Sequence, residues 1–568
     1  MDLKGLKRTT RSPYFFPGAV FVTVVLWFVL HIPILNYGTE PLPIHAAYVG
    51  DEQGPINGAL HILEQRSLLA LRDAYNTQYG PLISLMAVAP ALVDFAIHVI
   101  KSGTLDAESY KNSVIWDWTG ILFLGRLMAL AAGAAAVMAV FLIVRRFSST
   151  AAGLWPAAVA ALLLAANWHF FEYSTYYRHW VFVSAIMLWQ IYFLLRLRQE
   201  DGQRLFAWIM LIILPVLSFG ISYFGIFFQV MWLPVIIDWY RRRRFDLLKK
   251  FFYHGLVVVF GCALIIAWVP GPFYRAVGIG YGDISGQGVE EYVNEDYGGG
   301  FSFAYYANVV GTNNTALLLA LVLMLVVFYR QRVYFDRVMV GSVAFTAASY
   351  FVFFAFQSHH EPRYILPAIV LLMLLGGIVF TIMESRVWPQ DRSWHAVVVS
   401  LLIFQMLFHG VHIVRASYVF HQGAPEQVVI KVLLPVISAE PAMKILALRD
   451  NPFGYPHTKE SYGHYAKRFG FSDRSLFVTL QTSVAYPTGQ PLLNIDYFSF
   501  FHLSVDEAPR LSDYDLIIVR HRPNEPDTPN NRDQIDVNLM NWWYPEIDRD
   551  QFRLICASAK CSNYEGSF

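Results

Sequence analysis

A succession of long apolar segments constrains this chain more than any other feature of its sequence. A helix that crosses a bilayer needs about 20 mostly apolar residues. About eleven segments approach that length, and they lie at 15–35, 119–144, 151–168, 180–197, 205–218, 223–240, 252–270, 313–329, 338–356, 364–383 and 394–414. The sequence therefore predicts a mainly α-helical, polytopic membrane protein with about 11 transmembrane helices.

The composition agrees with a membrane protein and narrows its partners. Hydrophobic residues make up 56% of the chain and charged residues 15%, whereas soluble chains average about 25% charged residues. A net charge of +1, with no basic stripe outside the loops, argues against a nucleic-acid partner and leaves membrane lipids as the surroundings. Three cysteines are too few for a disulfide scaffold. Cys262 lies in an apolar segment and is expected to pack inertly. Cys556 and Cys561 would pair only in an oxidising compartment, and their pairing stays open.

Basic residues alternate between loops and so predict the orientation. Clusters occur before the first span, at Arg145–Arg146, at 196–204, at 241–250, at 330–337 and at 386–392. The positive-inside rule then places the N-terminus in the cytoplasm and the C-terminus outside, in an inner (plasma) membrane. The apolar segment Pro81–Ile100 would reverse this pattern if it crossed. We therefore expect it to lie along the outer surface, or to dip into the membrane and return.

The polar stretches define the expected domains. A transmembrane domain is predicted over residues 1–417, with external loops at 36–118 and 271–312, and a small extracytoplasmic α/β domain over 418–568. The loop 271–312 is rich in glycine and acidic residues, and it is either a surface loop or an active-site lid. In the C-terminal domain, Lys444–Leu448 and Asp515–Val519 have the composition of short strands.

An acidic pair, Asp51–Glu52, follows the first span on the predicted external side. Acidic pairs in external loops are most often simply solvated. Here the flanking residues are small and apolar, which would hold the carboxylates close to the membrane surface. A carboxylate in a partly desolvated cleft is a competent general base. The pair therefore indicates a membrane enzyme that acts beside a lipid-borne substrate.

A second polar motif, Ser358–Pro367, lies at the external mouth of a span and contains His359, His360, Arg363 and Tyr364. Arginine binds phosphate through two parallel hydrogen bonds. The alternative is an arginine that extends to the interface as an anchor. Two adjacent histidines also suggest a metal, although adjacent ligands are weaker support than spaced ones.

Two further features are candidates for the same region. The segment Phe171–Trp180 reads as a short external loop with Glu172, Arg178 and His179; it lines a sugar cleft or belongs to an interfacial aromatic belt. Arg126 lies near the external end of a span. Charges inside a membrane are functional candidates by default, and a structural ion pair is the alternative.

Together these pieces resemble the GT-C glycosyltransferases, and most of all the branch with protein O-mannosyltransferases and lipid A aminoarabinose transferases. The resemblance covers about residues 15–383. It is carried by the first span followed by Asp51–Glu52, by Tyr79-Gly80-Pro81-Leu82, by Gly125-Arg126-Leu127, and by His360-Glu361-Pro362-Arg363-Tyr364-Ile365-Leu366-Pro367.

The resemblance implies an enzyme that moves a sugar from a polyprenyl-phosphate donor to a hydroxyl of a glycan, lipid or protein acceptor on the external face. Asp51 would be the catalytic base, with Glu52 beside it, and Arg363 with Arg126 would stabilise the phosphate. Many relatives carry an acidic residue after the arginine of the second external loop, but here His179 follows Arg178 and the nearest acid is Glu172. No cofactor is certain, and a divalent metal stays open. A transporter or flippase of lipid-linked glycans, or a non-catalytic scaffold, are the alternatives.

Overall fold

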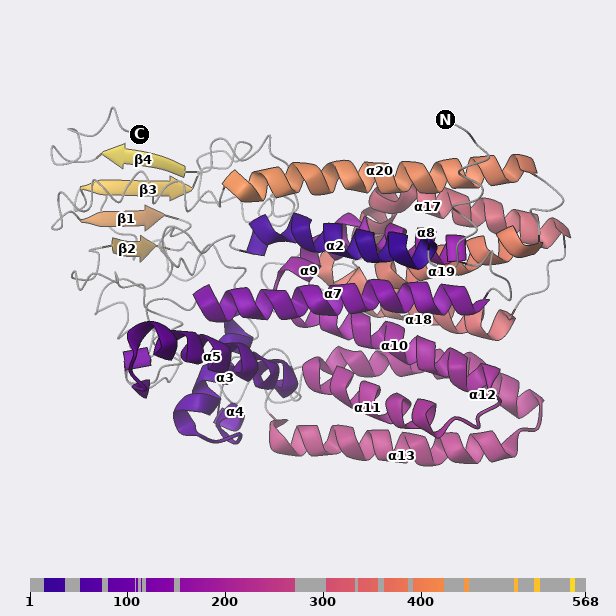
Figure 1. Ribbon diagram of the computed structural model, residues 1–568, viewed down its shortest axis with the longest axis horizontal. Helices are drawn as coiled ribbons and strands as arrows, with labels where there is room; N and C mark the ends of the chain where they lie inside the picture. Colours follow the sequence, from indigo (N-terminus) through magenta and orange to yellow (C-terminus); the bar gives the residue numbers. More distant parts are fainter. Residues whose placement is uncertain are drawn as a thin grey trace.

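The computed structural model describes the helical part of the chain and four strands. The described residues are 15–35, 52–73, 80–107, 109–110, 114, 119–147, 154–270, 303–331, 336–355, 362–386, 392–422, 444–448, 495–498, 515–520 and 552–556. Long helices run side by side in a bundle, and the strands lie beyond one of its ends, which we call the strand end (Figure 1).

The first half of the chain supplies one long apolar helix, three helices at the strand end and then five helices of the bundle. These are α2 (Phe15–Leu35), α3 (Gln53–Gln65), α4 (Ala70–Asp73), α5 (Pro81–Ser102), α7 (Thr119–Phe147), α8 (Leu154–Ala165), α9 (Trp168–Thr175), α10 (His179–Gln199) and α11 (Leu205–Ile221). Further along, the chain adds η4 (Tyr223–Met231), α12 (Trp232–Arg241), α13 (Phe245–Trp268), α17 (Phe303–Gln331), α18 (Arg337–Ala355), η5 (Pro362–Ile365), α19 (Leu366–Arg386) and α20 (Arg392–Gln422).

The predicted multi-pass membrane architecture is confirmed. Among the described residues, nine helices are long and apolar enough to cross a bilayer, or ten if the bent pair α8–α9 forms one span. The bundle core is apolar and centred on α19. In the apolar stretch of that helix 89% is buried, compared with only 22% in the apolar stretch of α13. An exposed apolar surface of that kind faces lipid in a membrane protein.

Three sequence predictions of boundaries were wrong. The predicted span 151–168 is broken after Ala165, and α9 continues at 60° to α8. The predicted loop Phe171–Trp180 shrinks to residues 176–178, because Asn167 caps α9 by accepting a hydrogen bond from the Phe170 amide at 3.1 Å. The predicted loop 271–312 extends too far at its C-terminal end, because α17 begins at Phe303. Short polar insertions such as Asn167 and Asn313–Asn314 leave no trace in a 20-residue average of apolarity.

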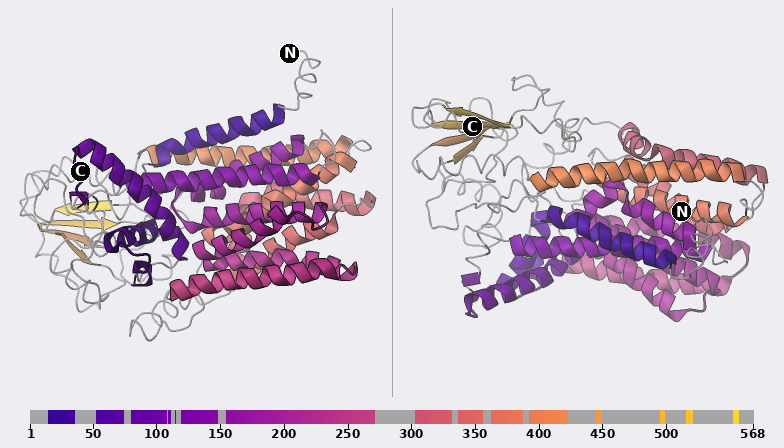
Figure 2. Two further views of the ribbon diagram at one scale, coloured as in Figure 1. Left: turned by 60° about the horizontal axis from the view of Figure 1, so that its bottom comes forward. Right: turned by 45° about the horizontal axis from the view of Figure 1, so that its top comes forward.

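The helices α3, α4 and α5 lie at the strand end of the bundle. Figure 2 shows α5 running obliquely across that end rather than alongside the long helices. By length and composition alone, α5 is one of the nine candidate spans. Its surface location therefore stays a prediction, which labelling at residue 104 tests.

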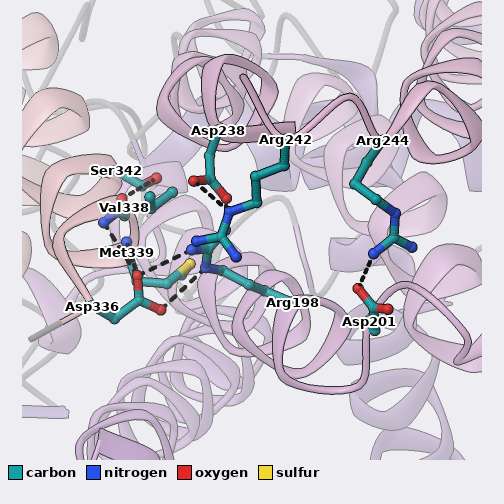
Figure 3. A network of polar contacts seen from close by, with 9 residues as sticks. All are labelled: Arg198, Asp201, Asp238, Arg242, Arg244, Asp336, Val338, Met339 and Ser342. Atoms are coloured by element: carbon teal, nitrogen blue, oxygen red, sulfur yellow. Dashed lines mark hydrogen bonds and ion pairs between the residues drawn. The ribbon is translucent and has the colours of Figure 1, made fainter. Parts of the chain in front are cut away.

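Charged residues gather at the opposite end of the bundle. Arg198 of α10 donates to Asp238 of α12 at 2.8 Å and to Asp336, just before α18, at 3.1 Å (Figure 3). Arg242 donates to the second oxygen of Asp238 at 3.0 Å. Asp336 also caps α18 by accepting from the amides of Val338 and Met339. This network fastens three helices at the end that the positive-inside rule assigns to the cytoplasm.

The C-terminal strands form one sheet in the order β2-β1-β3-β4. The strands are β1 (Ile445–Leu448), β2 (Ile495–Phe498), β3 (Leu516–Arg520) and β4 (Phe552–Cys556). β1 pairs in parallel with both β2 and β3, and β4 is antiparallel to β3. The two predicted strands are confirmed as β1 and β3. Most of residues 418–568, including Cys561, lie outside the described residues, so the α/β domain and its boundaries stay predictions and the pairing of Cys556 with Cys561 stays open. Cys262 is buried among apolar side chains of α11, η4 and α13, as expected.

Candidate functional site

The site is built around Glu52, which immediately precedes α3 and is fully buried. Arg126 of α7 grips its carboxylate with two hydrogen bonds, from Nε to Oε1 at 3.1 Å and from Nη2 to Oε2 at 2.8 Å. The backbone amide of Tyr177 donates to Oε1 at 2.7 Å. Both carboxylate oxygens are therefore occupied by short, charge-assisted hydrogen bonds, which is how a buried carboxylate is compensated.

Arg126 joins three helices at this point. Besides Glu52, its Nη1 donates to the carbonyl of Leu35, the last residue of α2, at 2.8 Å. The guanidinium is fully buried and so is its partner. Arg126 thus forms the ion pair that the sequence left as an alternative, and its contribution to phosphate binding stays a prediction.

The turn between α9 and α10 packs directly onto this ion pair. The ring of Tyr177 lies against Gly125, where an added Cβ would approach the ring carbon Cγ to 2.9 Å. The hydroxyl of Tyr177 donates to the carbonyl of Ile83 in α5 at 2.9 Å. The Gly125-Arg126 motif is therefore explained by a single contact region, in which the glycine admits the ring and the arginine binds the acid.

Glu172, Arg178 and His179 are all buried beside the turn. The Tyr176 ring lies close to two guanidinium groups, with the Cζ of Arg178 at 5.7 Å from the ring centroid and that of Arg126 at 5.9 Å. Glu172 lies within electrostatic range of Arg178. Arg178 is thus held close to the Glu52–Arg126 pair but is oriented by a different set of groups.

Aromatic contacts connect this turn to η5. The His179 ring lies 4.1 Å from that of Trp180, and the Trp180 ring lies 5.2 Å from that of Tyr364. The guanidinium of Arg363 in turn lies 5.5 Å from the Tyr364 ring centroid. The structure therefore brings Glu52, Arg126, Glu172, Arg178, His179, Arg363 and Tyr364 into one region.

Three predicted residues, Asp51, His359 and His360, lie outside the described residues. The sequence marked Gly125 as part of the Gly125-Arg126-Leu127 motif but gave it no role, and it gave none to the Tyr177 amide or the Tyr176 ring. The only available signal was the aromatic run Tyr173–Trp180, whose individual roles depend on contacts with distant helices.

The question of a metal is left open by the described residues. No group of three or more His, Cys, Asp or Glu side chains among them is arranged to hold a metal ion. Both oxygens of Glu52, the carboxylate that contacts the turn, already accept hydrogen bonds from Arg126 or Tyr177. The divalent metal therefore stays a prediction that concerns the residues outside the described set.

Comparison with known families assigns the chain. The sequence matches the profile of the Alg9-like mannosyltransferase family over residues 90–445, which is more than half of the chain. The chain belongs to the Alg9-like mannosyltransferase family. It is accordingly a membrane glycosyltransferase of the GT-C type, as its motifs indicated. No curated protein matches the sequence.

Solved structures with a similar course of the chain include ArnT from Cupriavidus metallidurans and the oligosaccharyltransferase AglB from Archaeoglobus fulgidus. ArnT bound to undecaprenyl phosphate shares 13% identity over 95% of this chain and 98% of its own, with a TM-score of 0.46. Its apo form has a TM-score of 0.48. AglB, in complex with an inhibitory peptide and a dolichol-phosphate, shares 10% identity over 89% of this chain and 69% of its own, with a TM-score of 0.47. At these values the similarity carries no argument about activity.

Proposed function

We propose that this glycosyltransferase moves a monosaccharide from a polyprenyl phosphate to an acceptor hydroxyl at the external face of the membrane, and that Asp51 is its catalytic base. The observation that carries the proposal is the grip of Arg126 and the Tyr177 amide on Glu52. Asp51 directly precedes Glu52 in the chain, so the fixed position of Glu52 limits how far Asp51 can lie from the candidate site.

Glu52 itself is a poor base in this arrangement. A base needs an oxygen within hydrogen-bond reach of the substrate proton, and both Glu52 oxygens are occupied. We therefore assign Glu52 a positioning role and reserve proton transfer for Asp51. The proposal thus gives the two adjacent carboxylates different roles because both oxygens of Glu52 already accept hydrogen bonds.

Arg363 and Arg178 are the proposed partners of the donor phosphate. Arg363 is half-buried in η5 and Arg178 is buried in the turn after α9. A planar guanidinium beside the leaving phosphate would stabilise the charge that develops as the sugar departs.

The reaction is a single displacement. The acceptor hydroxyl passes its proton to the Asp51 carboxylate, and its oxygen forms a bond to the anomeric carbon. The bond between that carbon and the phosphate oxygen breaks, so polyprenyl phosphate leaves with the electron pair. One displacement inverts the anomeric configuration. The polyprenyl chain of the donor lies among the membrane lipids, and the acceptor is a glycan, a lipid or a protein.

The decisive experiment compares Asp51→Asn and Glu52→Gln with the wild type in purified, folded form. Each would receive undecaprenyl-phosphate mannose or dolichyl-phosphate mannose with a membrane extract as the acceptor pool, and release of polyprenyl phosphate would be measured. General base catalysis contributes about 10²–10⁴-fold, so Asp51→Asn should lose at least that factor. Turnover of Asp51→Asn within a few-fold of the wild type would refute the assignment.

The same assay separates the alternatives. Membership of a mannosyltransferase family favours an enzyme over a transporter or flippase. A folded wild type that releases no polyprenyl phosphate from either donor would instead support the non-catalytic scaffold.

A further inference from the structure

Two breaks in transmembrane helices meet inside the bundle, away from the Glu52–Arg126 pair. One is the 60° bend between α8 and α9. The other is a kink within α17 at Asn314, whose backbone angles of φ −126° and ψ 24° are not helical. Backbone groups released by such breaks must be satisfied inside the protein, because lipid offers no hydrogen bonds.

The kink in α17 is bridged by the side chain of Gln405 from α20. In a regular helix the Leu317 amide would bond to the Asn313 carbonyl, four residues earlier. Here Oε1 of Gln405 accepts from the Leu317 amide at 3.2 Å, and Nε2 donates to the Asn313 carbonyl at 2.6 Å. Insertion of a side chain into the helical hydrogen-bond ladder is a recognised cause of a kink. Gln405 is 2% exposed, so water does not compete for these groups.

The backbone amide released by the bend before α9 is hydrogen-bonded by a side chain on the same face of α20. His409, one turn after Gln405, accepts at Nδ1 from the amide of Trp168, the first residue of α9, at 3.3 Å. Asn167 donates from Nδ2 to Oδ1 of Asn314 at 3.3 Å, which joins the two breaks directly. Asn167, Asn314 and His409 are all at most 1% exposed. We call Asn167, Asn314, Gln405 and His409 the polar junction.

Both helices that leave the junction lead to the candidate site. α9 carries Glu172 and ends just before the turn that holds Tyr177 and Arg178. α17 lies against η5, which carries Arg363. Burying apolar side chains here would have cost less desolvation free energy than burying polar ones. The polar cluster is therefore best explained if its hydrogen bonds set the geometry of the helices.

We propose that Gln405, together with His409, is a positioning residue: it holds the bends in α17 and α9 that place Arg363 and Arg178 at the donor phosphate. The proposal rests on the proposed function, because it assigns those two arginines to one ligand. It adds a role for α20, a helix that contributes no residue to the site itself.

The test separates stability from activity. Gln405→Leu removes the inserted amide. Gln405→Leu with Asn314→Ala also removes the residue at the kink, so that Leu317 regains its bond to Asn313 in a continuous helix. Thr381→Val is the matched control, because the Thr381 hydroxyl is equally buried but bonds only within α19, to the Gly377 carbonyl at 2.8 Å.

Three quantities would be measured on each variant. These are the thermal midpoint, the kcat/KM for undecaprenyl-phosphate mannose, and the distance between spin labels at the exposed residues Ala304 and Tyr329 of α17. We expect the double variant to regain the thermal midpoint that Gln405→Leu loses. Its label distance should lengthen towards about 38 Å, the value for a straight helix. Its kcat/KM should nonetheless stay at least about tenfold below the wild type, as a loss of 1.4 kcal/mol in transition-state binding implies, while Thr381→Val keeps wild-type activity.

Several results would overturn the proposal. A double variant that regains activity together with stability shows that the junction only stabilises the fold. A double variant that regains neither shows that other packing imposes the kink. A Gln405→Leu variant with wild-type label distance and activity shows that Gln405 holds nothing in place, and where this variant does not fold, the double variant decides. A wild type that uses neither donor refutes the proposed function instead, since the label distance and thermal midpoint need no donor.

Discussion

At the scale of single residues, the buried pair Glu52–Arg126 is the feature whose loss should be felt most strongly. Both side chains are fully buried, and each satisfies the charge of the other. Removing one partner strands a charge in a medium that cannot solvate it. Removing both avoids that penalty.

Arg126→Met should therefore lower the free energy of unfolding by about 3–5 kcal/mol. The double change Glu52→Gln with Arg126→Met should lose clearly less than the sum of the two single changes. Thermal or chemical denaturation of each purified variant in detergent measures these differences in unfolding free energy. Arg145→Met is the control, since Arg145 is exposed at the other end of α7 and should change stability little. Strict additivity of the two single losses would contradict the ion pair as the source of the stability.

Arg363 and Arg178 belong to the residue scale as well, as proposed phosphate ligands. Replacing either by lysine keeps the charge but removes the planar fork. A hydrogen bond to a charged group contributes about 1.5–3 kcal/mol, so we expect kcat/KM for the donor to fall about 10- to 100-fold. The thermal midpoint should change little. Wild-type rates in Arg363→Lys at subsaturating donor would favour the interfacial anchor instead.

At the scale of elements, the start of α5 is fixed by backbone contact with the end of α11. The Gly80 amide donates to the Ile221 carbonyl at 3.1 Å. A Cβ on Gly80 would lie 2.2 Å from the carbonyl oxygen of Gly220, a backbone atom that cannot rotate away. The Tyr79-Gly80-Pro81-Leu82 motif thus serves close packing, with the proline at the first turn of α5.

Gly80→Ala should push α5 away from α11 and lower stability by about 1–3 kcal/mol, as expected for overpacking. Gly255→Ala in α13 is the matched control, because a Cβ there meets nothing within 4 Å. That control should raise stability by about 0.5–1 kcal/mol through helix propensity. Thermal unfolding of both variants decides the point, and equal behaviour of the two would rule out the backbone contact as the constraint.

At the scale of the whole molecule, the two ends of the bundle differ in kind. One end holds the arginine–aspartate network of Figure 3, and the other holds α3, α4, α5 and the strands. The positive-inside rule places the first end in the cytoplasm and the second outside. The proposed external active site depends on this assignment.

Cysteines at Thr104 and Asn530, in a background without the three native cysteines, test the orientation. Both should react with a membrane-impermeant maleimide in intact spheroplasts. Reaction at 530 only after lysis would place the C-terminal strands in the cytoplasm. Protection at 104 with reaction at 530 would show that α5 crosses the membrane, and the arrangement of loops would have to be redrawn.

The sequence by itself determined the class of protein, because runs of about 20 apolar residues have few folded outcomes other than membrane helices. It also found the pieces of the site, since Glu52, Arg126, Arg178 and Arg363 stand out as polar residues at the ends of apolar segments. It found β1 and β3 from their composition. These features are local, and a window of sequence contains them.

Only the tertiary structure showed which contacts those residues make. The sequence treated Asp51 and Glu52 as an equivalent pair and left Arg126 between phosphate and ion pair. A contact between residues 52 and 126, completed by the amide of Tyr177, is the basis on which we propose different roles for the two acids. The breaks at Asn167 and Asn314 were missed for the same reason. A buried polar residue in an apolar segment destabilises the fold unless it finds a hydrogen-bond partner. Here the side chains that satisfy the two breaks come from α20, far along the chain.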